Sequence, residues 1–176
     1  MSKMTVYHGS NTEVAEPEVR KGRYSMRGRE SQRANAVFFV CSLIDYIARK
    51  TKNERCDIVE SLGEARIGKL IDLADVYHSE NIDELSDRLI DESDIAPGSF
   101  DNVGEARYIV PSHWDIGKVY KRLVLDIADD EHIGDAQAIM RAYAFPISPL
   151  LDNYNGSFYY GSPQAIYAAY RYGDLD

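Results

Sequence analysis

Apolar side chains recur along residues 34–51 with the spacing of an amphipathic helix. The segment reads ANAVFFVCSLIDYIARKT, and the recurring positions are 36, 37, 40, 43, 44 and 47. They follow the i, i+3, i+4 pattern that turns one face of a helix toward a core. Asn35 is the predicted N-cap of this helix, and Arg49 and Lys50 suit its C-terminal end.

Three further helices are predicted before residue 93. Residues 54–63 continue the apolar spacing, and Gly63 is a helix-ending signal. Residues 64–74 form a third short helix with four apolar residues in phase. Residues 81–92 form a fourth, which begins at Asn81 with a start that resembles a capping box.

A loop then separates these helices from the C-terminal part of the chain. Residues 93–112 hold two prolines and two glycines, which makes them the best internal boundary. Within this loop, Tyr108–Val110 predicts a short extended piece before Pro111. An amphipathic helix follows over residues 114–127, and a turn is predicted at Asp129–Glu131.

Two more helices are predicted toward the end of the chain. Residues 136–143 form one, and Pro146 and Pro149 are predicted to break it. Ser162–Pro163 combines an N-cap with a proline at the first helical position, and Gly173 ends the helix that follows.

The fold class follows from this density of short helices. The N-terminal residues 1–33 read as strand, turn and basic loop, with Thr5–Tyr7 as the strand. Residues 34–95 are a predicted helical module, and residues 96–176 are a second one packed with the first. We therefore expect a mainly α protein: a compact bundle of short helices with a short N-terminal strand and loop.

The net charge of the chain restricts the kinds of partner that it is expected to bind. The 176-residue chain has a formal net charge of -9, which argues against nucleic acid and anionic lipid as partners. Residues 20–33 are the exception, since they carry six basic side chains against one glutamate. No signal peptide is visible, and no apolar run approaches the ~20 residues that span a bilayer. A cytoplasmic protein is expected, with Cys41 and Cys56 as buried thiols on helix faces.

The start of the chain carries a family resemblance. The stretch YHGSNTEVAEPEVRKGRYS resembles the N-terminus of a bacterial family of ADP-ribosyltransferase-like proteins. The resemblance implies NAD as cofactor and His8 as the ribose-contacting histidine. It also implies that Gly9, Arg20 and Arg23 lie near the pyrophosphate. The register is lost after about residue 26, and no late strand with a catalytic glutamate follows.

Residues 36–92 carry a second resemblance. They resemble a small bacterial helical family of unknown function, with the turn at Ala74–His78 and the later Ile-Asp-Glu-x-Leu helix as matching features. Genes of that family often lie beside the transferase-like genes. The resemblance therefore implies a toxin–antitoxin-like or regulatory pairing. The C-terminal stretch from His113 resembles small proteins of the same gene neighbourhoods.

Other candidate chemistry is less specific. His78 and His113 lie near acids, but their spacing favours surface histidines over a metal site, so no metal is expected. Asp129–Glu131 lacks the spacing of a calcium loop and favours a solvated helix end. Phe158–Tyr160 suits a packed turn or a protein contact better than a platform for bases.

Two functions remain open at this point. The first is a non-catalytic protein without cofactor that works by protein–protein contact, with itself or with the neighbouring transferase-like gene product as partner. The Tyr-rich composition and the acidic balance favour it. The alternative is a divergent NAD-dependent ADP-ribosyltransferase that uses His8.

Overall fold

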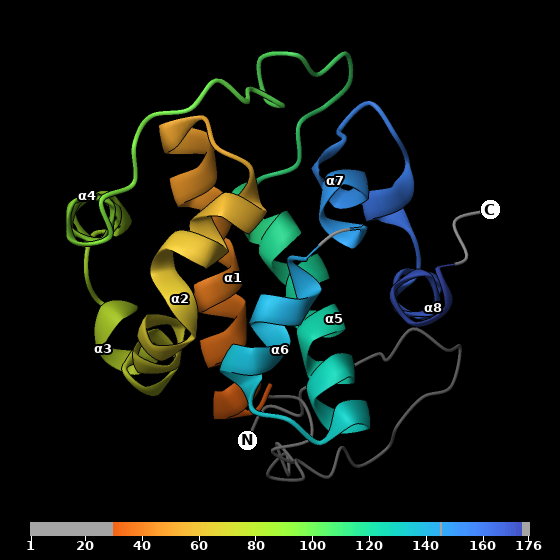
Figure 1. Ribbon diagram of the computed structural model, residues 1–176, viewed down its shortest axis with the longest axis horizontal. Helices are drawn as coiled ribbons and strands as arrows, with labels where there is room; N and C mark the ends of the chain where they lie inside the picture. The colour runs from red at the N-terminus through yellow and green to blue at the C-terminus, as the bar shows by residue number, and fades with distance from the viewer. Residues whose placement is uncertain (1–29, 145, 174–176) are drawn as a thin grey trace, which may run out of the picture. The chain divides into compact units, whose positions relative to one another are not determined.

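The computed structural model describes residues 30–144 and 146–173 (Figure 1). The chain divides into two units, Met1–Glu30 and Ser31–Asp176, and the description below concerns the second. The predicted strand at Thr5–Tyr7 lies outside the described residues.

The described residues are mainly helical and contain no strand, so the predicted fold class is confirmed for them. The helices succeed one another with short connections, apart from the loop between α4 and α5. They are α1 (Gln32–Thr51), α2 (Arg55–Asp72), α3 (Ala74–Tyr77), α4 (Ile82–Glu92), α5 (His113–Glu131), α6 (Asp135–Ala142), α7 (Ile147–Asp152), the short 3-10 helix η2 (Phe158–Tyr160) and α8 (Pro163–Tyr172).

The predicted end signals set several of these helices. The side chains of Asn81 and Ser162 each accept a backbone N–H from the first turn of α4 and α8. Gly173 ends α8 with a positive φ of 66°. Gly63 has φ 71° and ψ 158°, so it interrupts α2 with a kink where the sequence predicts one helix to end and another to begin.

Three local predictions are wrong. Ser31 caps α1 in place of Asn35, because its hydroxyl accepts the Ala34 N–H at 3.1 Å. Asp129–Glu131 is the last turn of α5 and not a turn beyond it, since the helix ends only where His132 takes a φ of 54°. Pro149 is the third residue of α7, where a helix needs no N–H donor, so it is compatible with a helix there.

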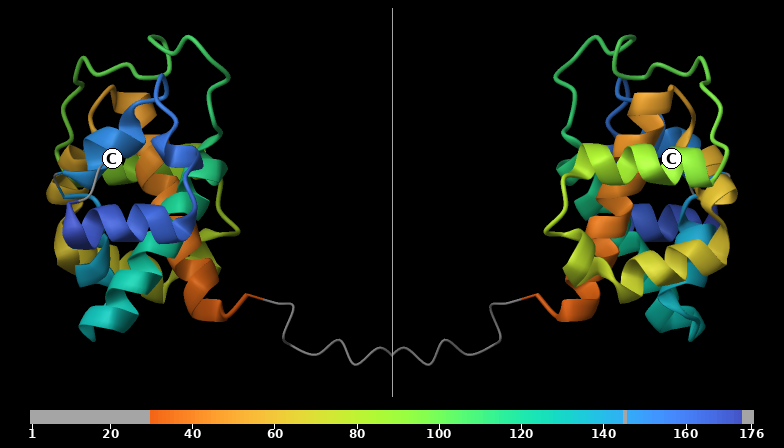
Figure 2. Two further views of the ribbon diagram at one scale, coloured as in Figure 1. Left: turned by 90° about the vertical axis from the view of Figure 1, so that its right-hand side faces the viewer. Right: turned by 90° about the vertical axis from the view of Figure 1, so that its left-hand side faces the viewer.

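Helix α1 lies at the centre of the bundle. α5 packs along α1, and α2 and α6 lie against this pair (Figure 1). α4 and α8 lie on opposite sides of the bundle (Figure 2). α1 is buried almost continuously from Ala36 to Ala48, as its central position requires.

The core is shared by residues before and after position 95. One hydrophobic cluster includes Leu43 and Ile58 together with Leu123 and Leu151. α5 approaches α1 closely at Gly117, where a Cβ would lie 3.0 Å from the Cα of Ser42 in α1 and overlap its hydroxyl. Within the described residues, no helix is both long and apolar enough to cross a bilayer.

Candidate functional site

The loop between α4 and α5, residues 93–112, runs over one end of the bundle (top of Figures 1 and 2). Its first part is held by the chain that links α1 to α2. The N–H groups of Gly98 and Phe100 donate to the carbonyls of Thr51 at 2.8 Å and Lys52 at 2.7 Å. Gly98 has no room for a side chain, because a Cβ would collide with the Lys52 carbonyl and the Asn53 side chain. These bonds fix the loop at its start.

The second part of the loop is held by the segment after α7. The side chain of Asn155 accepts the N–H of Arg107 at 2.7 Å and donates to the carbonyl of Glu105 at 3.1 Å. Asn102 donates to the carbonyl of Asp152 at 2.9 Å. Both ends of this 20-residue connection are thus hydrogen-bonded to other elements, which orders a segment that would otherwise be free to move.

Just beyond these anchors, two large apolar side chains face solvent. Tyr108 is 70% exposed and Ile109 is 85% exposed. The predicted extended piece at Tyr108–Val110 is not a strand. At the far end, Ser112 and Asp115 form a capping box that starts α5, so the loop is fixed again there. Tyr108 and Ile109 therefore lie between two parts of the loop that hydrogen bonds hold in place.

A cavity lies beneath the loop. Its volume is about 190 Å³, and Glu54, Phe100, Asn102, Glu105, Asp152 and Tyr154 are among the residues that line it. The lining comes from the α2 N-terminus, from the loop and from the end of α7. Asp152 and Tyr154 are 2% and 1% exposed, so they form the inner wall of the cavity.

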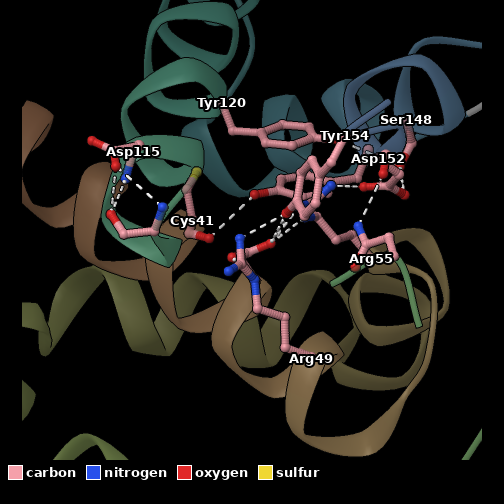
Figure 3. Close-up of polar contacts among 12 residues, drawn as sticks. Cys41, Arg49, Arg55, Asp115, Tyr120, Ser148, Asp152 and Tyr154 are labelled. Carbon is pink, nitrogen blue, oxygen red and sulfur yellow. Dashed lines mark hydrogen bonds and ion pairs between the residues drawn. The ribbon is translucent and has the colours of Figure 1, made fainter. Parts of the chain in front are cut away.

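Behind the cavity lies a buried ionic network centred on Arg55 (Figure 3). The Arg55 side chain is only 2% exposed. Its Nε donates to Oδ1 of Asp45 at 2.5 Å, and its Nη1 pairs with the carboxylate of Asp152. Its Nη2 donates to the hydroxyl of Tyr154. This guanidinium therefore connects α2 to α1, to α7 and to the segment after α7.

Neighbouring side chains complete the network. Arg49 pairs with the second oxygen of Asp45 at 2.7 Å and donates to the hydroxyl of Tyr154 at 2.7 Å. Burial by itself lowers the pKa of Arg55, but the Asp45 carboxylate and the surrounding tyrosines raise it above its usual value, so the guanidinium stays charged. Burial raises the pKa of Tyr154, although Arg55 opposes this shift, so the hydroxyl stays protonated near neutral pH.

Two stacked tyrosines form the inner side of the network. The rings of Tyr120 and Tyr143 lie 3.8 Å apart and 5° from parallel. Tyr120 donates to the Ser148 hydroxyl at 3.3 Å, and Ser148 donates to Asp152 at 3.4 Å. Tyr143 donates to the carbonyl of Cys41 at 3.4 Å. These bonds link α5 to α7 and the end of α6 to α1, so the network holds together the elements that lie beneath the loop.

Sequence reasoning missed this network, although a signal was present. Arg55 precedes Ile58 and Val59 by three and four positions, and Asp45 follows Cys41 by four. Each charged residue therefore lies in phase with an apolar stripe, where a charge is buried and needs a partner. Cys56, predicted to be buried, is half-buried, whereas Cys41 is fully buried.

The other predicted candidates lie in ordinary surroundings. His78 is exposed and stacks on Phe39, and His113 packs against Tyr46 and Trp114, where burial lowers its pKa. In the part of the chain that the structure describes, no group of His, Cys, Asp and Glu could hold a metal ion. The predicted solvated acids of the α5 C-terminus pair with arginines: Asp129 with Arg33, Asp130 with Arg171, and Glu131 with Arg141 and Arg171. Of Phe158–Tyr160, only Tyr159 is buried.

The residues tied to NAD binding are His8, Gly9, Arg20 and Arg23, and all four lie outside the described residues. Comparisons of the chain with protein-family models, with curated proteins and with solved structures give no significant match. The two resemblances, and the NAD-dependent activity that one of them implies, stay predictions.

Proposed function

We propose that this protein acts by binding another protein, and that Tyr108 and Ile109 on the loop between α4 and α5 form the centre of the contact. The observation that carries the proposal is their exposure, 70% and 85%, on a loop that hydrogen bonds hold on both sides. Single exposed apolar residues are common on soluble proteins. Two adjacent ones on an anchored loop are less readily explained by chance.

The anchoring matters because binding fixes the conformation of flexible groups and loses their entropy. A loop that is already ordered loses less on association, so more of the contact energy appears as affinity. Tyrosine is enriched among the residues that dominate interface energetics, and it adds a hydrogen-bonding hydroxyl to its apolar ring. A rigid loop with an aromatic tip suits recognition of a concave protein surface.

Charge indicates the partner's chemistry. The net charge of the chain is -9, and its first 29 residues contain more basic than acidic side chains, so the helical body is more acidic than the average suggests. A partner with basic side chains around an apolar recess would complement it. We propose a bacterial cytoplasmic setting, with the neighbouring ADP-ribosyltransferase-like protein as a toxin–antitoxin-like or regulatory partner.

The test uses the full chain and the purified transferase-like protein in a binding titration. Replacing Tyr108 and Ile109 together by serine should weaken binding on the order of tenfold or more, as loss of central contact residues does. Tyr172→Ser is the matched control, because Tyr172 is 79% exposed on α8 and its loss should leave binding unchanged. Equal binding by the double variant and the wild type would contradict the proposed surface. Self-association lost in the double variant would assign the surface to a second copy of the chain.

A further inference from the structure

The cavity beneath the loop has an excess of negative charge. Glu54, Glu105 and Asp152 line it, and the only cation that touches these carboxylates in the described part of the chain is Arg55, which pairs with Asp152. The Glu54 carboxylate accepts a weak bond from the Cys56 thiol at 3.6 Å, and Glu105 is exposed. By contrast, Asp101 on the same loop pairs with Lys52 at 2.7 Å.

The remaining lining favours a flat cation over a compact one. Phe100 and Tyr154 are the aromatic residues of the lining, and Asn102, Asn153 and Asn155 are its amide-bearing residues. A guanidinium is planar, stacks on aromatic faces and offers five N–H donors to carboxylate and carbonyl oxygens. It is also less strongly hydrated than an ammonium group, so it enters a half-apolar cavity more readily.

Two guanidinium groups already contact Tyr154, one of the lining residues, from within the buried network. Within the buried network, Cζ of Arg49 lies 5.3 Å from the centre of the Tyr154 ring, and Cζ of Arg55 lies 5.6 Å from it. Both guanidinium groups also bond to carboxylates. The lining of the cavity also combines an aromatic residue with carboxylates, since Phe100, Glu54 and Glu105 lie outside the buried network and line it.

We propose that this cavity, bounded by Glu54, Glu105 and Asp152, is a binding site for a guanidinium group. A free small molecule and an arginine side chain of a bound protein both carry this group, and the chemistry of recognition is the same for both. The site does not depend on the contact surface at the loop tip.

The test titrates methylguanidinium into the full chain and follows the backbone amide resonances of Asn102 and Asn155 by NMR. We expect a saturable shift that weakens with added salt, and none with N-methylurea, which is flat but uncharged. Glu54→Gln and Glu105→Gln should each weaken binding by about two- to fivefold, as expected for partly exposed ion pairs. Glu60→Gln is the control, since Glu60 is exposed on α2 and does not line the cavity.

A second titration with the peptide acetyl-Gly-Arg-Gly-amide separates the two sources. Binding at least as tight as that of methylguanidinium would assign the site to an arginine side chain. Binding of methylguanidinium alone would assign it to a free small molecule. The proposal is overturned if neither probe gives a saturable shift, or if N-methylurea binds as tightly as methylguanidinium. It is also overturned if the double variant Glu54→Gln/Glu105→Gln binds methylguanidinium as tightly as the wild type.

Discussion

Replacing Arg55 by methionine would remove the cation that several buried oxygens share. The guanidinium is 2% exposed and bonds to the carboxylates of Asp45 and Asp152 and to the hydroxyl of Tyr154. Methionine has a similar length and no charge, so the variant removes the charge with a modest change of volume. Asp45 keeps its pair with Arg49, whereas Asp152 keeps only the hydroxyl of Ser148.

The expected loss of stability follows from the carboxylate charge that stays buried without its partner. Removing one partner of a buried ion pair lowers the free energy of unfolding by about 3–5 kcal/mol, because the other charge stays buried without compensation. That is a large part of the ~5–15 kcal/mol that stabilises a typical domain. Adding Asp152→Asn to Arg55→Met removes the remaining charge as well, and should restore about 1–3 kcal/mol.

The assay is urea unfolding followed by far-ultraviolet circular dichroism, with the m-value checked for each variant. Arg88→Met is the matched control. Arg88 also pairs with an acid, Glu80 at 2.8 Å, but its side chain is 46% exposed, so its loss should leave the unfolding curve unchanged. Arg55→Lys keeps the charge without the forked geometry and should fall between the wild type and the methionine variant.

A loss below about 1 kcal/mol for Arg55→Met would refute this account, since it would mean that the buried carboxylates do not need the guanidinium. A double variant no more stable than Arg55→Met alone would refute it in another way. It would show that the Asp152 carboxylate is not destabilising once Arg55 is gone, so the loss in Arg55→Met would not come from an uncompensated buried charge.

Three further outcomes are expected. Gly117→Ala should lower the free energy of unfolding by about 1–3 kcal/mol in urea titrations, because its methyl group would overlap α1. Gly68→Ala is the control and should be neutral or stabilising, because its methyl group would lie 3.9 Å from the nearest atom, the Cβ of Ala136. Ser112→Ala removes the α5 cap and should destabilise the protein by about 1 kcal/mol in the same assay. Burial raises the pKa of Cys41 to about 12, and burial with nearby acids raises that of Cys56 to about 11. At pH 8 a thiol reagent should therefore modify half-buried Cys56 slowly and Cys41 only after unfolding.

The helices could be predicted because their signals are local. Apolar spacing located α1 and α5, and Asn81, Ser162 and Gly173 marked ends that the structure confirms. The N-cap of α1 was predicted wrongly because two suitable residues lie close together in the sequence. Asn35 is a good cap residue, but Ser31 lies four positions earlier and also caps well, and spacing alone does not choose between them.

The buried network could be found only in part. Arg55 and Asp45 lie in apolar phase, which predicts that each is buried and paired, but not with which partner. Asp152 and Tyr154 are about a hundred residues away in sequence, and their contact depends on how α7 packs. The cavity and the exposed pair on the loop depend on the same packing, so no local pattern predicts them.

The loop over the bundle joins two parts of the chain that share one core and one ionic network. If a protease cut the backbone at Tyr108 or Ile109, α1 and α2 would remain held to α5 and α7 by interactions that do not pass through the cut. The nicked protein should therefore remain assembled under native conditions and separate into its two pieces only on denaturation. The same position is a natural place to divide the gene into two fragments that reassemble when expressed together.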